Sequence, residues 1–115
     1  MSSTDRKLFP DALTDRIAQR LRVLGEPARL HLLNTLAENG EMNVQELVEA
    51  TGIHQANASK HLNLMAREGL LSRSKSGLFV YYAIRDASLQ GICLLLSGQI
   101  REELEQEQRT LRLLK

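Results

Sequence analysis

Residues 44–84 read VQELVEATGIHQANASKHLNLMAREGLLSRSKSGLFVYYAI. The spacing of their apolar residues predicts two short helices, 44–50 and 55–68, joined by the turn Thr51-Gly52-Ile53-His54. Glycine at position 52 can adopt at low cost the left-handed conformation that a sharp turn between helices requires. The segment therefore begins as a helix-turn-helix.

A β-hairpin pattern follows the second of these helices. Short strands are predicted at 70–73 and 78–84, and Ser74-Lys75-Ser76-Gly77 between them has the composition of a turn. Helix, tight turn, helix and hairpin together form the layout of a winged helix-turn-helix. In this layout the second helix has the dimensions to enter the DNA major groove.

Two further helices are predicted upstream, at about 10–24 and 27–38, and Gly25-Glu26-Pro27 separates them. Asn43 and Glu46 have the spacing of a capping box at the start of the helix 44–50. Apolar residues recur at helical spacing, with Leu13, Ile17, Leu21 and Leu24 in the first helix and Leu30, Leu33 and Leu36 in the second.

A last helix is predicted at about 87–111, with Asp86 as its cap. It is longer and more apolar than one small domain can cover, which favours a homodimer whose seam combines the first and last helices. The predicted interface residues are Leu13, Ile17, Leu21, Leu89, Ile92, Leu96, Ile100 and Leu104.

The predicted fold class is therefore mainly α with a small β-hairpin wing, in the order α-α-α-α-β-β-α, dimeric through the first and last helices. Residues 1–9 are expected to form a mobile arm, 10–111 the DNA-binding and dimerisation domain, and 112–115 a frayed C-terminus.

Composition places the chain among ordinary globular proteins. Of its 115 residues 43% are hydrophobic, 25% are charged and only 3% are aromatic, so aliphatic side chains have to build the core. No apolar run approaches the ~20 residues of a membrane span, and no signal-peptide pattern is present. A single cysteine, Cys93, fits a reducing compartment. These features predict a cytoplasmic protein without a membrane partner.

The distribution of charge is more informative than the net charge of +1. Between residues 54 and 85 the chain has five Lys and Arg residues and a single acid, Glu68, whereas residues 86–115 carry a small excess of acids. Positive charge is thus concentrated on the predicted reading unit, as nucleic-acid binding requires. A solvated face would not explain the lack of acids there.

Polar side chains on the outer face of the helix 55–68 can exchange hydrogen bonds with base edges, and cations in the hairpin can contact phosphates. For any single side chain the alternative is ordinary helix surface. The candidate DNA contacts are Gln55, Ala56, Asn57, Ser59, Lys60, His61 and Asn63 in the helix and Arg73, Lys75, Ser76 and Gly77 in the hairpin.

Four stretches resemble the ArsR/SmtB family of dimeric winged-helix repressors of bacteria. They are LGEPARL at 24–30, GIHQANASKHL at 52–62, EGLL at 68–71 and GLFVYY at 77–82. The resemblance extends from about residue 12 to 104. It implies a homodimer that binds a near-palindromic operator in double-stranded DNA and releases it when an inducer binds.

The sensing sites that the family commonly uses are missing from this sequence. Asn43 and Gln45 stand where many family members have a Cys-Val-Cys box, and amides are poor ligands for soft metals. In the last helix the family's histidine-containing pairs are replaced by Asp86 with Ser88 and by Gln99 with Glu102. The spacing of His31, His54 and His61 favours no zinc site. Neither a metal nor a cofactor is therefore expected.

Cys93 remains as a possible thiol sensor. Cys93 and Ser97 resemble the Cys-x-x-x-Cys of some family members with the second sulfur replaced, which an engineered exchange would also produce. On an apolar stripe, a lone cysteine is more commonly a small core residue. Three alternatives are therefore expected: the inducer is a thiol-reactive or oxidising agent that acts at Cys93, the inducer is an organic ligand, or the protein responds to no inducer.

The sequence disfavours two other classes of function. A winged-helix module for protein contacts would bind DNA weakly and without sequence preference, and the basic segment argues against it. An enzyme is disfavoured because no catalytic triad, phosphate-binding glycine loop or complete metal site is present.

Overall fold

The computed structural model describes residues 6–114. The chain divides into two units, Met1–Arg85 and Asp86–Lys115, each of which is described by itself. Of the predicted mobile arm, residues 1–5 lie outside the described part. Lys7 is tied to the start of the first helical segment by a 3.1 Å ion pair with Asp11.

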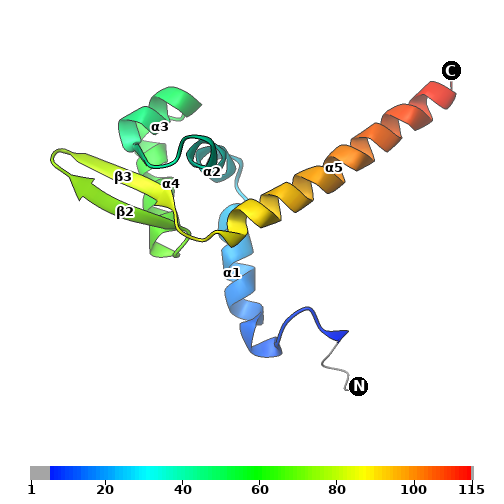
Figure 1. Cartoon of the computed structure of the whole chain (residues 1–115), viewed down its shortest axis with the longest axis horizontal. Helices are drawn as coiled ribbons and strands as arrows, with labels where there is room; N and C mark the ends of the chain where they lie inside the picture. Colours follow the sequence, from blue (N-terminus) through cyan, green and yellow to red (C-terminus); the bar gives the residue numbers. More distant parts are fainter. Residues whose placement is uncertain (1–5, 115) are drawn as a thin grey trace. The chain divides into compact units, whose positions relative to one another are not determined.

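Four α-helices form most of the first unit (Figure 1). A 3₁₀ turn, η2 (Asp11–Leu13), leads into α1 (Thr14–Leu24), followed by α2 (Pro27–Asn39), α3 (Val44–Thr51) and α4 (Gln55–Arg67). The predicted boundaries agree closely because capping and breaking residues define them locally. Pro27 opens α2 at a position where its missing N–H costs nothing.

The helix-turn-helix has the local structure that the sequence predicts. Asn43 Oδ1 accepts a 2.8 Å hydrogen bond from the Glu46 N–H, and Glu46 Oε1 accepts a 2.9 Å bond from the Asn43 N–H. This reciprocal pair is the predicted capping box of α3. Gly52 ends that helix with φ +74°, a left-handed conformation that turns the chain toward α4.

The sheet differs from the prediction in two respects. It has three antiparallel strands rather than two, because β1 (Met42–Asn43) pairs with β3 (Phe79–Ile84), which in turn pairs with β2 (Leu71–Ser76). The predicted turn at 74–77 was too long. Ser76 pairs with Phe79, so the turn consists of Gly77 and Leu78, and Lys75 and Ser76 belong to a strand.

The core of the first unit consists of apolar side chains from its four helices and from all three strands of the sheet. Fully buried members are Leu32 and Leu36 of α2, Leu47 of α3, Leu62 and Met65 of α4, and Tyr82 of β3. Leu30 lies outside this core, although it has helical spacing with Leu33 and Leu36. Its side chain is 41% exposed, because the inner face of α2 is the one that carries Leu32, Leu33 and Leu36.

The second unit is the helix α5 (Ser88–Leu113). The N-cap position is Ala87 rather than the predicted Asp86, which precedes it and accepts a 3.0 Å hydrogen bond from the Ser88 N–H with its Oδ1. The helix runs two residues beyond the predicted end at 111, so Arg112 and Leu113 are helical rather than frayed. Across the described residues, 6–114, no helix is both long and apolar enough to cross a membrane.

Candidate nucleic-acid interface

The exposed face of α4 lies opposite its buried face. Ala58, Leu62 and Met65 are fully buried, which directs the other side of the helix to solvent. On the opposite side of the helix, four exposed residues form a stripe at helical spacing, namely Ala56, Lys60, Asn63 and Arg67. Gln55 and Asn57 are exposed at the flanks of this stripe, and Ser59 is half-buried. Among these, sequence reasoning missed Arg67, although its spacing from Lys60 and Asn63 was the available signal.

His54 caps α4, a role that the sequence analysis did not predict. Its Nδ1 accepts a 3.3 Å hydrogen bond from the Ala56 N–H. A histidine is an unusual N-cap, so residue type alone gave no signal. The bond fixes the first turn of the helix, where the candidate base-reading side chains begin.

His61, predicted as a DNA contact, packs against a neighbouring helix. Its Nδ1 lies 3.2 Å from Arg29 Nη1, and Arg29 Nε donates to the Val23 carbonyl at the end of α1. Because a guanidinium can only donate, Nδ1 is the acceptor and the ring proton is on Nε2. Burial lowers the pKa of His61, and the charge of Arg29 lowers it further. Only Nε2 therefore remains to reach DNA.

The candidate residues of the wing are exposed on the hairpin, which extends away from the helices (Figure 1). Arg73, Lys75 and Ser76 lie on β2, and Gly77 opens the turn with φ +61°. A positive φ at this position suits the right-handed twist of a two-residue hairpin.

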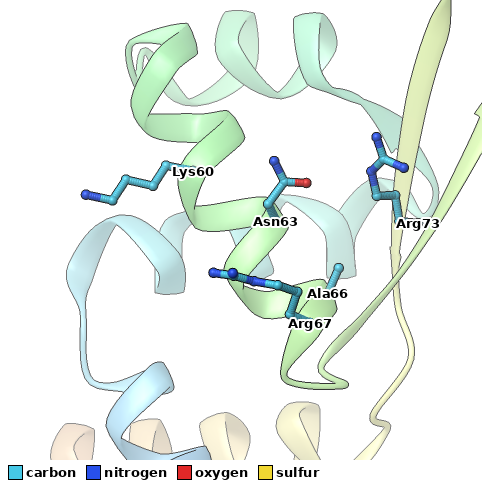
Figure 2. Close-up of a pocket in the computed structure, with 5 residues that line it drawn as sticks. All are labelled: Lys60, Asn63, Ala66, Arg67 and Arg73. Carbon is cyan, nitrogen blue, oxygen red and sulfur yellow. The ribbon is translucent and has the colours of Figure 1, made fainter.

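A groove between α4 and β2 brings several of these residues together. It is lined by Lys60, Asn63, Ala66, Arg67 and Arg73, which Figure 2 shows as one group on the two elements. Arg73 of the wing thus lines the same groove as three residues of the outer stripe of α4.

The candidate sensing positions of α5 are not brought together in the same way. Cys93 is half-buried with a free thiol, and Ser97 Oγ donates to the Leu94 carbonyl of its own helix. Gln99 bonds Glu103 within the helix, and Asp86 bonds Ser88. Among residues 6–114, no three His, Cys, Asp or Glu side chains form a group that could hold a metal ion.

A helix-turn-helix with a basic, donor-rich second helix and a hairpin beside it defines a winged-helix DNA-binding domain. Comparison with known proteins agrees. The model of the MarR family matches residues 26–78, which extend from the start of α2 to the hairpin turn and exclude α5.

The transcriptional repressor PagR of Bacillus anthracis is 32% identical over 93 residues, which make up 81% of this chain and 92% of PagR. The repressor SmtB of Mycobacterium tuberculosis is 32% identical over 74% of this chain and 62% of its own length. The chain belongs to the ArsR/SmtB family of winged-helix transcriptional regulators.

Two solved structures are similar over nearly the whole chain. The antimony-specific transcriptional repressor AntR has a TM-score of 0.76 and 30% identity, covering 90% of this chain and 93% of its own. The homodimeric DNA-binding domain Mb0332 of Mycobacterium bovis, a possible ArsR-family regulator, has a TM-score of 0.72 and 28% identity, covering 91% and 92%. The predicted winged helix-turn-helix fold is confirmed, with the additional strand β1, and the dimer through the first and last helices stays a prediction.

Proposed function

We propose that this chain is a homodimeric, cytoplasmic repressor that binds a near-palindromic operator in double-stranded DNA and releases it in response to an inducer. The observation that carries the proposal is the exposed stripe of α4, which has hydrogen-bond donors and no acid, beside a basic wing. Membership of a family of transcriptional regulators supports the same function.

The two parts of the interface have different tasks. Gln55 and Asn57 carry amides that pair with the donor and acceptor atoms of base edges, so they determine sequence preference. Lys75 and Arg73 on the wing carry full charges and contact phosphates, which gives affinity and salt dependence without sequence information. A repressor needs both contributions to bind one site among many.

A dimer is needed to present two such units to successive major grooves. On α5 the side chains of Leu96, Ile100 and Leu104 are 57%, 51% and 55% exposed in the single chain. On α1, Leu13 and Leu21 are 45% and 49% exposed. Apolar stripes of this kind are normally covered by a partner, and Mb0332 is described as homodimeric. We assign them to the seam between two copies of this chain.

The remaining predicted interface residues are less exposed. Ile17 and Ile92 are half-buried and Leu89 is buried. The seam is therefore centred on the later part of α5 and on Leu13 and Leu21.

The inducer does not follow from the relatives. AntR is antimony-specific, and a relative from Bacillus subtilis is an arsenical resistance operon repressor. In this chain Asn43 holds the cap of α3 with its side-chain oxygen, and it offers no thiolate to such metals. The proposed signals are a thiol-reactive or oxidising agent acting at Cys93, an organic ligand, or none.

The test is fluorescence anisotropy of the full chain on duplex DNA from upstream of its own gene, with a scrambled duplex as competitor. Tight, salt-sensitive and competitor-resistant binding is expected. Zinc, arsenite, peroxide and persulfide are then added separately to the preformed complex, and release by one of them identifies the class of inducer. Binding that the scrambled duplex removes equally well would contradict the proposal and favour a protein-interaction module.

A further inference from the structure

The groove between α4 and β2 is lined by three cations and one amide. Lys60, Arg67 and Arg73 supply the positive charge, Asn63 lies between them, and Ala66 adds no polar atom (Figure 2). No carboxylate belongs to the lining. Among residues 6–114, none of these three cations forms an ion pair with an acid.

The acid next in sequence is held away from the groove. Glu68 follows Arg67 at the end of α4, and its Oε1 accepts a 3.4 Å hydrogen bond from Gln19 of α1. Its carbonyl accepts a 3.3 Å bond from Arg20 of the same helix. The carboxylate of Glu68 is therefore turned toward α1, which leaves the positive potential of the groove in place.

Tyr82 is a buried residue that contacts the groove lining through Asn63. Its side chain is 2% exposed, and its hydroxyl donates a 2.7 Å hydrogen bond to Asn63 Oδ1. Tyr82 is also the direct cross-strand partner of Arg73, so both side chains lie on the same face of the sheet. One buried ring thus positions a residue of α4 next to a residue of the wing.

The hydrogen bond determines which atom Asn63 presents. With Oδ1 engaged by Tyr82, the free part of the amide is Nδ2, a donor. Figure 2 shows the amide oxygen on the side of the strands and the nitrogen pointing away from them. All polar groups that the groove offers are consequently donors, which is the complement of an oxyanion.

We propose that this groove binds one phosphodiester of the DNA backbone, with Arg67 as a contact and Tyr82 as the residue that positions Asn63. The proposal rests on the proposed function and assigns the partner of this part of the interface. Arg67 shares its stripe with Lys60, and Arg73 lines the same groove from the wing. The groove therefore lies between the major-groove helix and the hairpin, where the strand that borders a major groove passes. Planar guanidiniums match the geometry of a phosphate.

Arg67→Gln tests the contact, and Arg101→Gln on the exposed surface of α5 is the matched control for the lost charge. The dissociation constant is measured by anisotropy over a series of NaCl concentrations, on the upstream duplex and on a scrambled duplex. Arg67→Gln is expected to weaken binding to both duplexes about tenfold at low salt. It should also lower the slope of log Kd against log salt by about one for each protomer bound. Arg101→Gln is expected to change neither quantity.

Tyr82→Phe and Asn63→Ala test the positioning role in a double-mutant cycle. Tyr82→Phe keeps the buried ring and removes only the hydroxyl. It is expected to weaken DNA binding several-fold in the wild-type background and to have no further effect once Asn63 is alanine. Thermal unfolding of each variant reports any loss of fold separately. An equal effect of Tyr82→Phe in both backgrounds would overturn the positioning role.

The two proposals fail in different ways. If the wild-type chain binds the upstream duplex selectively and Arg67→Gln leaves the salt slope unchanged, the groove proposal is wrong and the repressor stands. If the wild-type chain binds both duplexes equally and Arg67→Gln still lowers the slope, the groove proposal holds and the repressor is wrong. Failure of the wild-type chain to bind any DNA overturns both.

Discussion

Gln55 and Asn57 differ from Lys60 and Arg67 in what they can contribute to a DNA-binding helix. Amides discriminate between bases, whereas cations bind the backbone that every sequence shares. Replacing Gln55 and Asn57 together by alanine is expected to lower the preference for the upstream duplex by about tenfold or more. Binding to scrambled DNA should change little. Competition anisotropy measures the ratio, and unchanged discrimination would remove both residues from base reading.

His61 gives a pH dependence whose sign follows from its surroundings. Burial and Arg29 lower its pKa in the folded chain, below the unperturbed value of about 6.5 that applies after unfolding. Between these two values the unfolded chain binds more protons. The free energy of unfolding therefore falls as the pH drops from about 6.5 through the folded pKa. The slope is shallow, because the ring is half exposed and solvent screens its charge.

Urea unfolding between pH 7.5 and pH 5 measures this contribution. His61→Gln is expected to flatten the decline relative to the wild-type chain, because glutamine can accept from Arg29 without titrating. His31→Gln on the exposed surface of α2 is the control and should retain the wild-type decline. A decline of equal steepness in His61→Gln and the wild-type chain would show that His61 does not cause it.

At the residue scale, interactions between residues a few positions apart could be predicted from the sequence. Interactions between residues far apart in the sequence could not. Asn43 and Glu46 lie three positions apart, so their pairing could be predicted from the sequence. Tyr82 and Asn63 are 19 positions apart, and His61 and Arg29 are 32 apart. Both longer contacts exist only because packing brings different elements together. For this reason the sequence reveals neither the contact of His61 with Arg29 nor the role of Tyr82.

At the scale of elements, the turn between α3 and α4 depends on one backbone conformation. Gly52 has φ +74°, and no other heavy atom lies within 4 Å of the place that a Cβ would take. Gly52→Ala is therefore expected to cost about 1 kcal/mol through the left-handed conformation alone, without a clash.

Gly98 in α5 provides the matched comparison. A Cβ there also meets nothing within 4 Å, but the residue is in the middle of a regular helix. Gly98→Ala is expected to stabilise the chain by about 0.5–1 kcal/mol because alanine favours the helix. Thermal or urea unfolding of both variants checks the opposite signs. Two changes of the same sign would contradict the argument from φ.

The strand β1 shows what local pattern cannot predict about elements. Met42 and Asn43 are too few to produce an alternating pattern, and they form a strand only because Tyr82 and Tyr81 pair with them. The hairpin itself was predicted, since its alternation and its glycine are local signals. The predicted turn at 74–77 begins too early, because serine and lysine are common in turns and are also tolerated on an exposed strand. Ser74, Lys75 and Ser76 belong to the strand.

At the scale of the whole molecule, the proposed dimer depends on the apolar stripe of α5. Leu96→Glu places a charge in that stripe and is expected to shift the chain to monomer in sedimentation velocity, weakening operator binding at least tenfold. Leu94→Glu is the control, since Leu94 is 72% exposed and lies about 160° from Leu96 around the helix. A dimer that survives Leu96→Glu, or dissociates equally with Leu94→Glu, would place the seam elsewhere.

Asn43 belongs to the sheet through its pairing with Tyr81 and to the helix-turn-helix as the cap of α3. Tyr82, one residue along the same strand, is bonded to α4. The base of the wing is thus fastened to both ends of the helix-turn-helix. A repressor whose wing is held in this way is not expected to release DNA by moving the hairpin alone. For the proposed dimeric repressor, release is therefore expected to displace each reading unit as one rigid body, and the proposed inducer would act on the spacing or the mobility of the two units.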